Sequence, residues 1–178
     1  MKQDFPEVIK EVYVGRTFKG KKIRGYIFFK GGNSQRSFKS QVKARPGIFI
    51  NGAHHPRELT SISMNVYIML KLLHATVHKK PILSDLISKK VSIFFVPVVN
   101  QDGYEEIARH FAATGKLIYI RKNRHDISRG LARCTGANQD IGVDLNRNYD
   151  YKFRGEGSSN DPCAVETHGP YPFSEPET

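Results

Sequence analysis

Residues 47–73, GIFINGAHHPRELTSISMNVYIMLKLL, decide the fold because they contain two different hydrophobic periods in direct succession. The stretch 46–51 is short and apolar and is bounded by proline and glycine, which predicts a β-strand. From Leu59 onward apolar residues recur at spacings of three and four, which predicts a helix with one apolar face that runs until Pro81. That face would consist of Ile62, Val66, Met69, Leu70, Leu73 and Val77.

The flanking segments continue this alternation. Two β-rich stretches, residues 11–15 and 23–30, precede the strand, and a shorter helix is expected at 82–87. Residues 91–99, VSIFFVPVV, are apolar on both faces, which is typical of a strand in a parallel sheet covered by helices. Another helix is expected from Gly103 to about Ala112. Strand, helix, strand and helix in this order predict an α/β fold with right-handed crossovers.

The composition is that of one globular domain. The chain has 178 residues, of which 39% are hydrophobic, and no apolar stretch is long enough to cross a bilayer. The first residues show no signal-peptide pattern. The net charge is +11, and residues 1–50 hold 12 basic and 3 acidic side chains. This excess is either a solvated surface or a basic module for acidic partners or nucleic acid. Nucleic acid is disfavoured because no groove-binding helix or RNA-binding signature occurs.

A His-x-x-Glu motif, His55 to Glu58, follows the strand and leads into the long helix. An imidazole and a carboxylate three residues apart on one helical turn can reach the same point, and α/β sheets bind ligands at the carboxyl ends of strands. Histidine and glutamate are two of the three donors of a His₂Glu zinc site. Taken alone, the motif is a weak signal, and a helix N-terminus at which the dipole favours Glu58 is the better interpretation. His54 is expected to lie outside the ligand set.

Further segments occur in a fixed order, namely GRTFKGKKI at 15–23, VVNQDGY at 98–104, YIRKNR at 119–124 and GVDLNRNYD at 142–150. Together with the His-x-x-Glu motif they resemble the metallocarboxypeptidases of the carboxypeptidase A/B type, over nearly the whole chain. The resemblance implies a partial α/β/α sandwich with a mixed, largely parallel central sheet, truncated relative to the family domain. It also implies a zinc-dependent exopeptidase that acts on the C-termini of peptides or proteins.

The resemblance implies a role for individual residues of the central motifs. His55 and Glu58 match the first two zinc ligands, and Arg57 between them matches a substrate-contacting arginine. Arg121 matches the catalytic arginine that polarises the scissile carbonyl and stabilises the oxyanion. Without the resemblance, Arg121 would be interpreted as part of a solvated basic loop.

The remaining motif residues match a carboxylate clamp and a disulfide. Asn146 and Arg147 match the pair that grips the terminal carboxylate of the substrate, and a guanidinium suits this task because it offers two parallel hydrogen bonds. In a turn-rich segment the same two residues could also be ordinary loop residues. Cys134 and Cys163 flank this segment as a disulfide does in the pancreatic-type members, which implies an extracytoplasmic, secreted or vacuolar/lysosomal setting for the full-length protein.

Part of the family pattern is not found among these residues. The resemblance places the second zinc histidine and the general base after Thr178, and His168 lies in a segment that precedes the third ligand. Only a short stretch precedes residue 15, where the family domain has an opening helix. Residues 1–178 are therefore expected to form an incomplete catalytic domain, inactive alone, with an unpaired sheet edge that favours aggregation. The complete domain would bind one Zn²⁺ and act as a monomer; its side-chain preference is not encoded here.

Overall fold

The computed structural model of the chain describes residues 4–29, 40, 42–86, 91–127 and 141–178. Its contacts divide the chain into two compact units. Unit 1 comprises Met1–Val14, Arg24–Gly52 and Thr60–Pro97, and unit 2 comprises Gly15–Ile23, Ala53–Leu59 and Val98–Thr178. None of the helices within the described ranges is long and apolar enough to cross a membrane.

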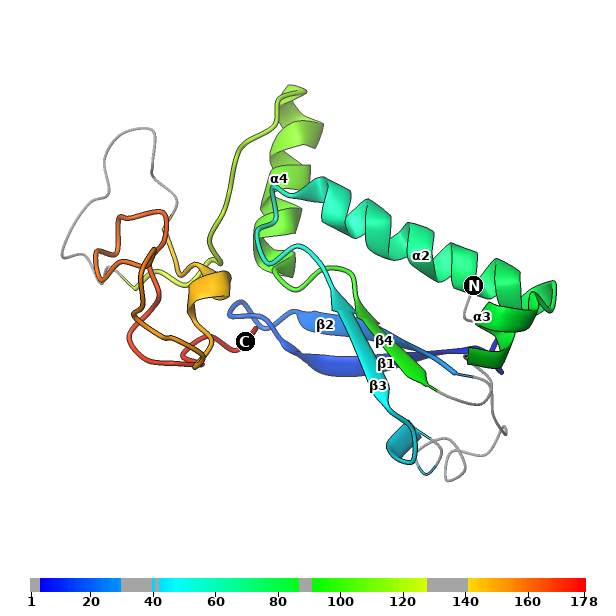
Figure 1. The fold of residues 1–178 in the computed structure, drawn as a ribbon. Coiled ribbons are helices and arrows are strands. Elements are labelled where there is room, and N and C mark those ends of the chain that lie inside the picture. Colours follow the sequence, from blue (N-terminus) through cyan, green and yellow to red (C-terminus); the bar gives the residue numbers. More distant parts are fainter. Residues whose placement is uncertain (1–3, 30–39, 41, 87–90, 128–140) are drawn as a thin grey trace. The chain divides into compact units, whose positions relative to one another are not determined.

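Four strands form one sheet in the order β1-β2-β4-β3 (Figure 1). Their bounds are Ile9–Arg16 for β1, Lys22–Phe28 for β2, Gly47–Asn51 for β3 and Ser92–Val96 for β4. Strand β4 pairs antiparallel with β2 and parallel with β3, so the sheet is mixed, and the predicted α/β class is confirmed. Strand β3 lies at one edge of this sheet, where Ile48 and Phe49 are exposed.

Helix α2 (Leu59–Val77) runs along one face of the sheet (Figure 1). The core of unit 1 joins helix residues such as Met69 and Leu73 to the strand residues Phe28, Ile93 and Phe95. The rings of Phe28 and Phe95 meet edge to face at 5.5 Å between centroids, an arrangement that aromatic pairs favour. Burial of these apolar side chains is what holds α2 on the sheet.

The buried side of α2 differs from the predicted apolar face. Met69 and Leu73 are buried as expected, but Val66, Leu70 and Val77 are 38%, 48% and 46% exposed. The prediction failed because α2 carries apolar residues on more than one side, and spacing alone does not select the side that meets the sheet. Asn65 is buried instead, because its amide donates to a carbonyl one turn earlier at 2.9 Å and to the last carbonyl of β3 at 3.3 Å.

Three shorter elements lie after α2 in the sequence. Helix α3 (Pro81–Asp85) follows α2, and helix α4 (Gln101–Thr114) and the single 3₁₀ turn η2 (Leu145–Arg147) belong to unit 2. Asn100 caps α4 by accepting from the backbone N–H of Gly103 at 3.0 Å. Apart from its helix and short turn, unit 2 is mostly irregular chain, and it buries a series of polar side chains. The series includes Asn100, Lys122, Asn123, Asp144 and Asn148.

Candidate active site

The two predicted metal ligands lie on the loop between β3 and α2. His55 is only 6% exposed, and its Nδ1 lies 2.9 Å from Oε1 of Glu58. A backbone hydrogen bond from the N–H of Glu58 to the carbonyl of His55, 3.0 Å long, closes the turn that brings them together. The two side chains therefore point to the same side of their turn, as a shared ligand requires.

The carboxylate of Asp144 joins three segments that are distant in sequence. Its Oδ1 accepts from Nε2 of His55 at 2.9 Å and from the backbone N–H of Asn146 at 3.0 Å. Its Oδ2 accepts from Nε and Nη2 of Arg121 at 3.0 and 2.8 Å. Asp144 is not among the site residues that the sequence motifs predict. The available signal was its position two residues before Asn146, where an aspartate often accepts from a backbone N–H.

Asp144 is ionised by its partners in spite of its burial. Loss of solvent is the largest single influence and opposes ionisation of this carboxyl group. The hydrogen bond from His55 and the positive charge of Arg121 together outweigh it, so the pKa of Asp144 lies below its ordinary value. The site therefore contains a buried negative charge that faces both an imidazole and a guanidinium.

Asn123 and Gly142 hold the segment that carries Asp144. Asn123 and Val143 exchange two hydrogen bonds of 2.9 Å, one between their backbones and one from the N–H of Val143 to Oδ1 of Asn123. Gly142 has a φ of 134°, and a Cβ placed on it would lie 2.2 Å from the carbonyl oxygen of Asn123. Only glycine fits there. The N–H of Asp144 donates to the carbonyl of Thr167 at 2.8 Å, which fixes the start of η2.

Asn100 connects the ligand loop to the segment that carries Arg121. Its Nδ2 donates to the carbonyls of His54 at 3.2 Å and Lys122 at 3.0 Å. The backbone N–H of Arg57 donates to the carbonyl of Ile120 at 3.2 Å. These bonds tie the backbones of the two segments together next to the side chains that carry the chemistry.

The predicted substrate-binding residues lie around this centre. Asn146 is exposed and Arg147 half-buried, and both belong to η2 directly after Asp144. The guanidinium of Arg147 donates to the carbonyl of Gly157 at 2.9 Å and to that of Asn146 at 3.3 Å. The side chain of Arg57 is exposed. The structure thus brings His55, Glu58, Arg121 and the backbone of Asn146 together through Asp144, whereas Arg57 is joined to the site through its backbone.

His54 has a different partner from His55. Its Nε2 lies 2.7 Å from the hydroxyl of Tyr149, whose ring packs edge to face on Phe173. Burial, followed by the neighbouring His55, lowers the pKa of His54, and burial raises the pKa of Tyr149. His54 therefore belongs to a separate, partly buried pair beside the two predicted ligands.

The donors present fit part of a zinc site. Imidazole nitrogen and carboxylate oxygen are ligands that Zn²⁺ takes, and the hydrogen bond from Nε2 of His55 to Asp144 is the outer support typical of a metal-ligating histidine. Within the described ranges, no group of three or more His, Cys, Asp and Glu side chains is placed to hold a metal ion. His168 is engaged elsewhere, with Nε2 2.9 Å from Oδ1 of Asn160.

The predicted disulfide is not tested by the structure. Cys134 lies outside the described residues. Cys163 is half-buried, and its backbone N–H donates to Oδ1 of Asp161 at 2.9 Å. The Cys134–Cys163 bridge stays a prediction.

Comparison with known proteins agrees with the resemblance seen in the sequence. The family model described as Zinc carboxypeptidase, Peptidase_M14, matches residues 1–178. Carboxypeptidase A4 of Mus musculus is 34% identical over 174 residues, which cover 98% of this chain and 36% of that protein. Carboxypeptidase B of Astacus astacus is 30% identical and is covered to 48%. The chain thus spans between a third and a half of the length of these relatives.

The fold is also found among solved structures. The crystal structure of carboxypeptidase A from Helicoverpa armigera is 28% identical and superposes with a TM-score of 0.70, over 99% of this chain and 37% of that one. The crystal structure of thrombin activatable fibrinolysis inhibitor is 24% identical with a TM-score of 0.75, over 99% of this chain and 38% of that one, which shows a shared fold.

Proposed function

Because the chain belongs to the zinc carboxypeptidase family, we propose that it forms part of an exopeptidase that hydrolyses the C-terminal bond of peptides or proteins. The observation that carries the proposal is the arrangement around Asp144. One buried carboxylate accepts from a predicted zinc ligand, from the predicted catalytic arginine and from the backbone of the predicted carboxylate clamp.

His55 and Glu58 would hold the metal. A proton on Nε2 of His55 is directed at Asp144 at 2.9 Å, which leaves the lone pair of Nδ1 on the side of Glu58. Asp144 thereby selects the tautomer and the ring orientation that a metal ligand needs. When bound, Zn²⁺ acts as a Lewis acid and makes water a stronger acid.

Arg121, Asn146 and Arg147 would bind the substrate. A guanidinium has five N–H donors, of which Asp144 engages two on Arg121. Arg121 is thus oriented by a buried charge, and a guanidinium held in this way would stabilise the developing oxyanion. Arg147 would grip the terminal carboxylate together with Asn146, and Arg57 would contact the substrate beside the metal. Because both clamp residues follow Asp144 within one turn, the clamp and the ligand share one support.

The described residues bring only two metal donors together, so we propose that residues 1–178 by themselves lack peptidase activity. Loss of an essential member of a catalytic group typically costs several orders of magnitude in rate. We further propose that they form the first part of one catalytic domain of a monomeric enzyme, and that the complete enzyme works in an oxidising, extracytoplasmic compartment in which Cys134 and Cys163 are bridged.

Zinc titration in competition with a chromogenic chelator tests the metal assignment. His55→Ala should weaken zinc binding by about tenfold or more, because structural and catalytic sites depend on every protein donor. His54→Ala is the matched control, since it removes the adjacent imidazole, and it should change the affinity by less than about twofold. Equal losses in the two variants would show that zinc binds the histidine pair without selection, and the assignment of His55 would fall.

The alternative of a basic binding module makes an opposite prediction for Arg147. A polyanion binder draws on many dispersed charges, so Arg147→Ala should hardly change its affinity for an acidic polymer. A carboxylate clamp should lose most of its affinity for a peptide with a free C-terminus. Binding of a free-acid peptide and of its C-terminal amide, measured side by side for both proteins, separates the two functions.

A further inference from the structure

Unit 2 contains a cavity that shares no lining residue with the candidate active site. Its volume is about 360 Å³. Sites for small molecules typically occupy ~300–1,000 Å³ and combine apolar walls with a few polar groups. Its polar walls include Arg154, Asn160 and His168, and its apolar walls include Ile127, Pro162 and Pro170.

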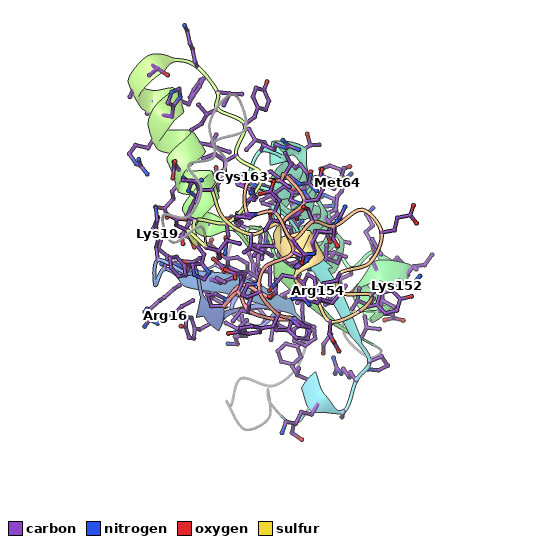
Figure 2. The ribbon with its side chains drawn as sticks, turned by 90° about the vertical axis from the view of Figure 1, so that its left-hand side faces the viewer. Arg16, Lys19, Met64, Lys152, Arg154 and Cys163 are labelled. Carbon is purple, nitrogen blue, oxygen red and sulfur yellow. The ribbon has the colours of Figure 1, made fainter. Side chains whose placement is uncertain are left out.

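The backbone presents Arg154 in an unusual conformation. Its φ is 61°, in the left-handed region that residues with a Cβ rarely adopt, and Lys152 two residues earlier has a φ of 53°. A hydrogen bond of 2.9 Å from the N–H of Gly155 to the carbonyl of Lys152 closes the turn between them. Figure 2 labels both side chains. Strained backbone concentrates at binding and catalytic positions, and here it carries a cavity-lining cation.

The guanidinium of Arg154 is held on the cavity wall. Its Nη2 donates to the carbonyl of Pro170 at 3.2 Å, and its Cζ lies 5.6 Å from the centre of the Phe153 ring. The same ring packs edge to face on His168 at 4.8 Å. The side chain is exposed, and the printed hydrogen bond engages one of its five N–H groups, so further donors can reach a ligand.

The second polar side chain of the wall is Asn160, which is exposed. Its Oδ1 lies 2.9 Å from Nε2 of His168, and His168 is buried with its Nδ1 against the carbonyl of Gly169. No aspartate or glutamate is among the lining residues in the described part of the chain. A lining guanidinium without a lining carboxylate favours an anion.

We propose that this cavity binds a small carboxylate with an apolar body. The fork of Arg154 matches a planar carboxylate, and the lining residues Ile127, Pro162 and Pro170 offer apolar contacts to the rest of the molecule. A free amino acid fits less well, because its ammonium group finds no acidic partner among the described lining residues. An N-acylated amino acid keeps the carboxylate and the apolar side chain without that charge.

Titration of the full 178-residue chain with N-acetyl-L-leucine tests the proposal, with binding followed by calorimetry and by ligand-observed NMR. Every protein in the series carries Arg147→Ala, which removes the carboxylate clamp of the proposed active site from the measurement. In this background Arg154→Gln should weaken binding by about tenfold, the effect of losing a charge-assisted pair. Lys152→Gln is the matched control on the same turn, and its affinity should stay within about twofold.

The ligand series tests the carboxylate and the missing ammonium group. Leucine and N-acetyl-L-leucinamide should each bind about tenfold more weakly than N-acetyl-L-leucine.

Three outcomes would overturn the proposal. One is the absence of saturable binding in the Arg147→Ala background, and another is an unchanged affinity in Arg154→Gln. The third is an equal loss in Lys152→Gln, which would mean that surface charge alone attracts the acid. Each of these outcomes leaves the zinc titration of His55→Ala untouched, so the failure of this proposal and the failure of the proposed function can be told apart.

Discussion

Replacing Asp144 by asparagine is the sharpest perturbation of the candidate site. The carboxylate accepts four hydrogen bonds, two on each oxygen. Asparagine has one acceptor oxygen and one amide nitrogen, and the nitrogen must face either the donors of Arg121 or those of His55 and Asn146. In either orientation the new amide nitrogen, itself a donor, faces two N–H donors that the carboxylate used to accept from. The guanidinium of Arg121 also loses its buried counter-charge.

The expected loss of stability is large. Removing one partner of a buried ion pair costs about 3–5 kcal/mol in comparable cases, against a total of ~5–15 kcal/mol for a domain. Urea unfolding followed by far-UV circular dichroism and by tyrosine fluorescence measures this loss, since the chain has 8 tyrosines and no tryptophan. Asp150→Asn is the control, because Asp150 is exposed, and it should change the free energy of unfolding by less than about 0.5 kcal/mol.

The acid dependence of stability gives a second measurement on the same proteins. The pKa of Asp144 is lower in the folded protein than its ordinary value, so the folded state binds the proton less well than the unfolded state does. Its contribution to stability is therefore present above the unfolded pKa of about 3.9 and is lost as the pH falls through the folded pKa. The gap in stability between wild type and Asp144→Asn should narrow in that acid range. A gap of less than about 1 kcal/mol at neutral pH would refute the central role of Asp144.

Two further predictions concern the backbone and the cysteines. Ala53 is buried with a φ of 51°, in the left-handed region that glycine adopts without strain. Ala53→Gly should therefore raise the free energy of unfolding by about 0.5–1 kcal/mol. This is the strain that glycine relieves, less the cost of the larger conformational entropy of the unfolded chain. Ala75→Gly, at a buried position in the last turn of α2, should instead lower it by about 1 kcal/mol, and a loss in both variants would contradict the strain argument. Thiol titration of denatured, non-reduced protein should detect no free thiol if Cys134 and Cys163 are bridged. Two reactive thiols would contradict the bridge, which is expected to contribute about 3 kcal/mol.

Much of the fold could be predicted because its signals are local. The strand around Ile48, the long helix from Leu59 and the buried strand around Phe94 each have a period that nearby residues define. The orientation of α2 could not be predicted, because Val66 and Leu70 look as apolar as the residues that the sheet covers. The choice between sides of a helix depends on what packs against it, and that partner lies elsewhere in the chain.

The candidate site also has one part that the sequence predicted and one part that only the tertiary structure decided. The sequence by itself determined the residue types and the order of the motifs, and it pointed to His55, Glu58 and Arg121 through their neighbours along the chain. Only the tertiary structure assigned Asp144 its place, because that residue acts through a hydrogen bond to His55 across 89 positions of sequence. It likewise placed Arg154 on the wall of a cavity in unit 2. Short-range patterns decide which elements and motifs exist, whereas a buried charge acquires its partners only when folding brings distant segments together and excludes the water that would otherwise solvate it.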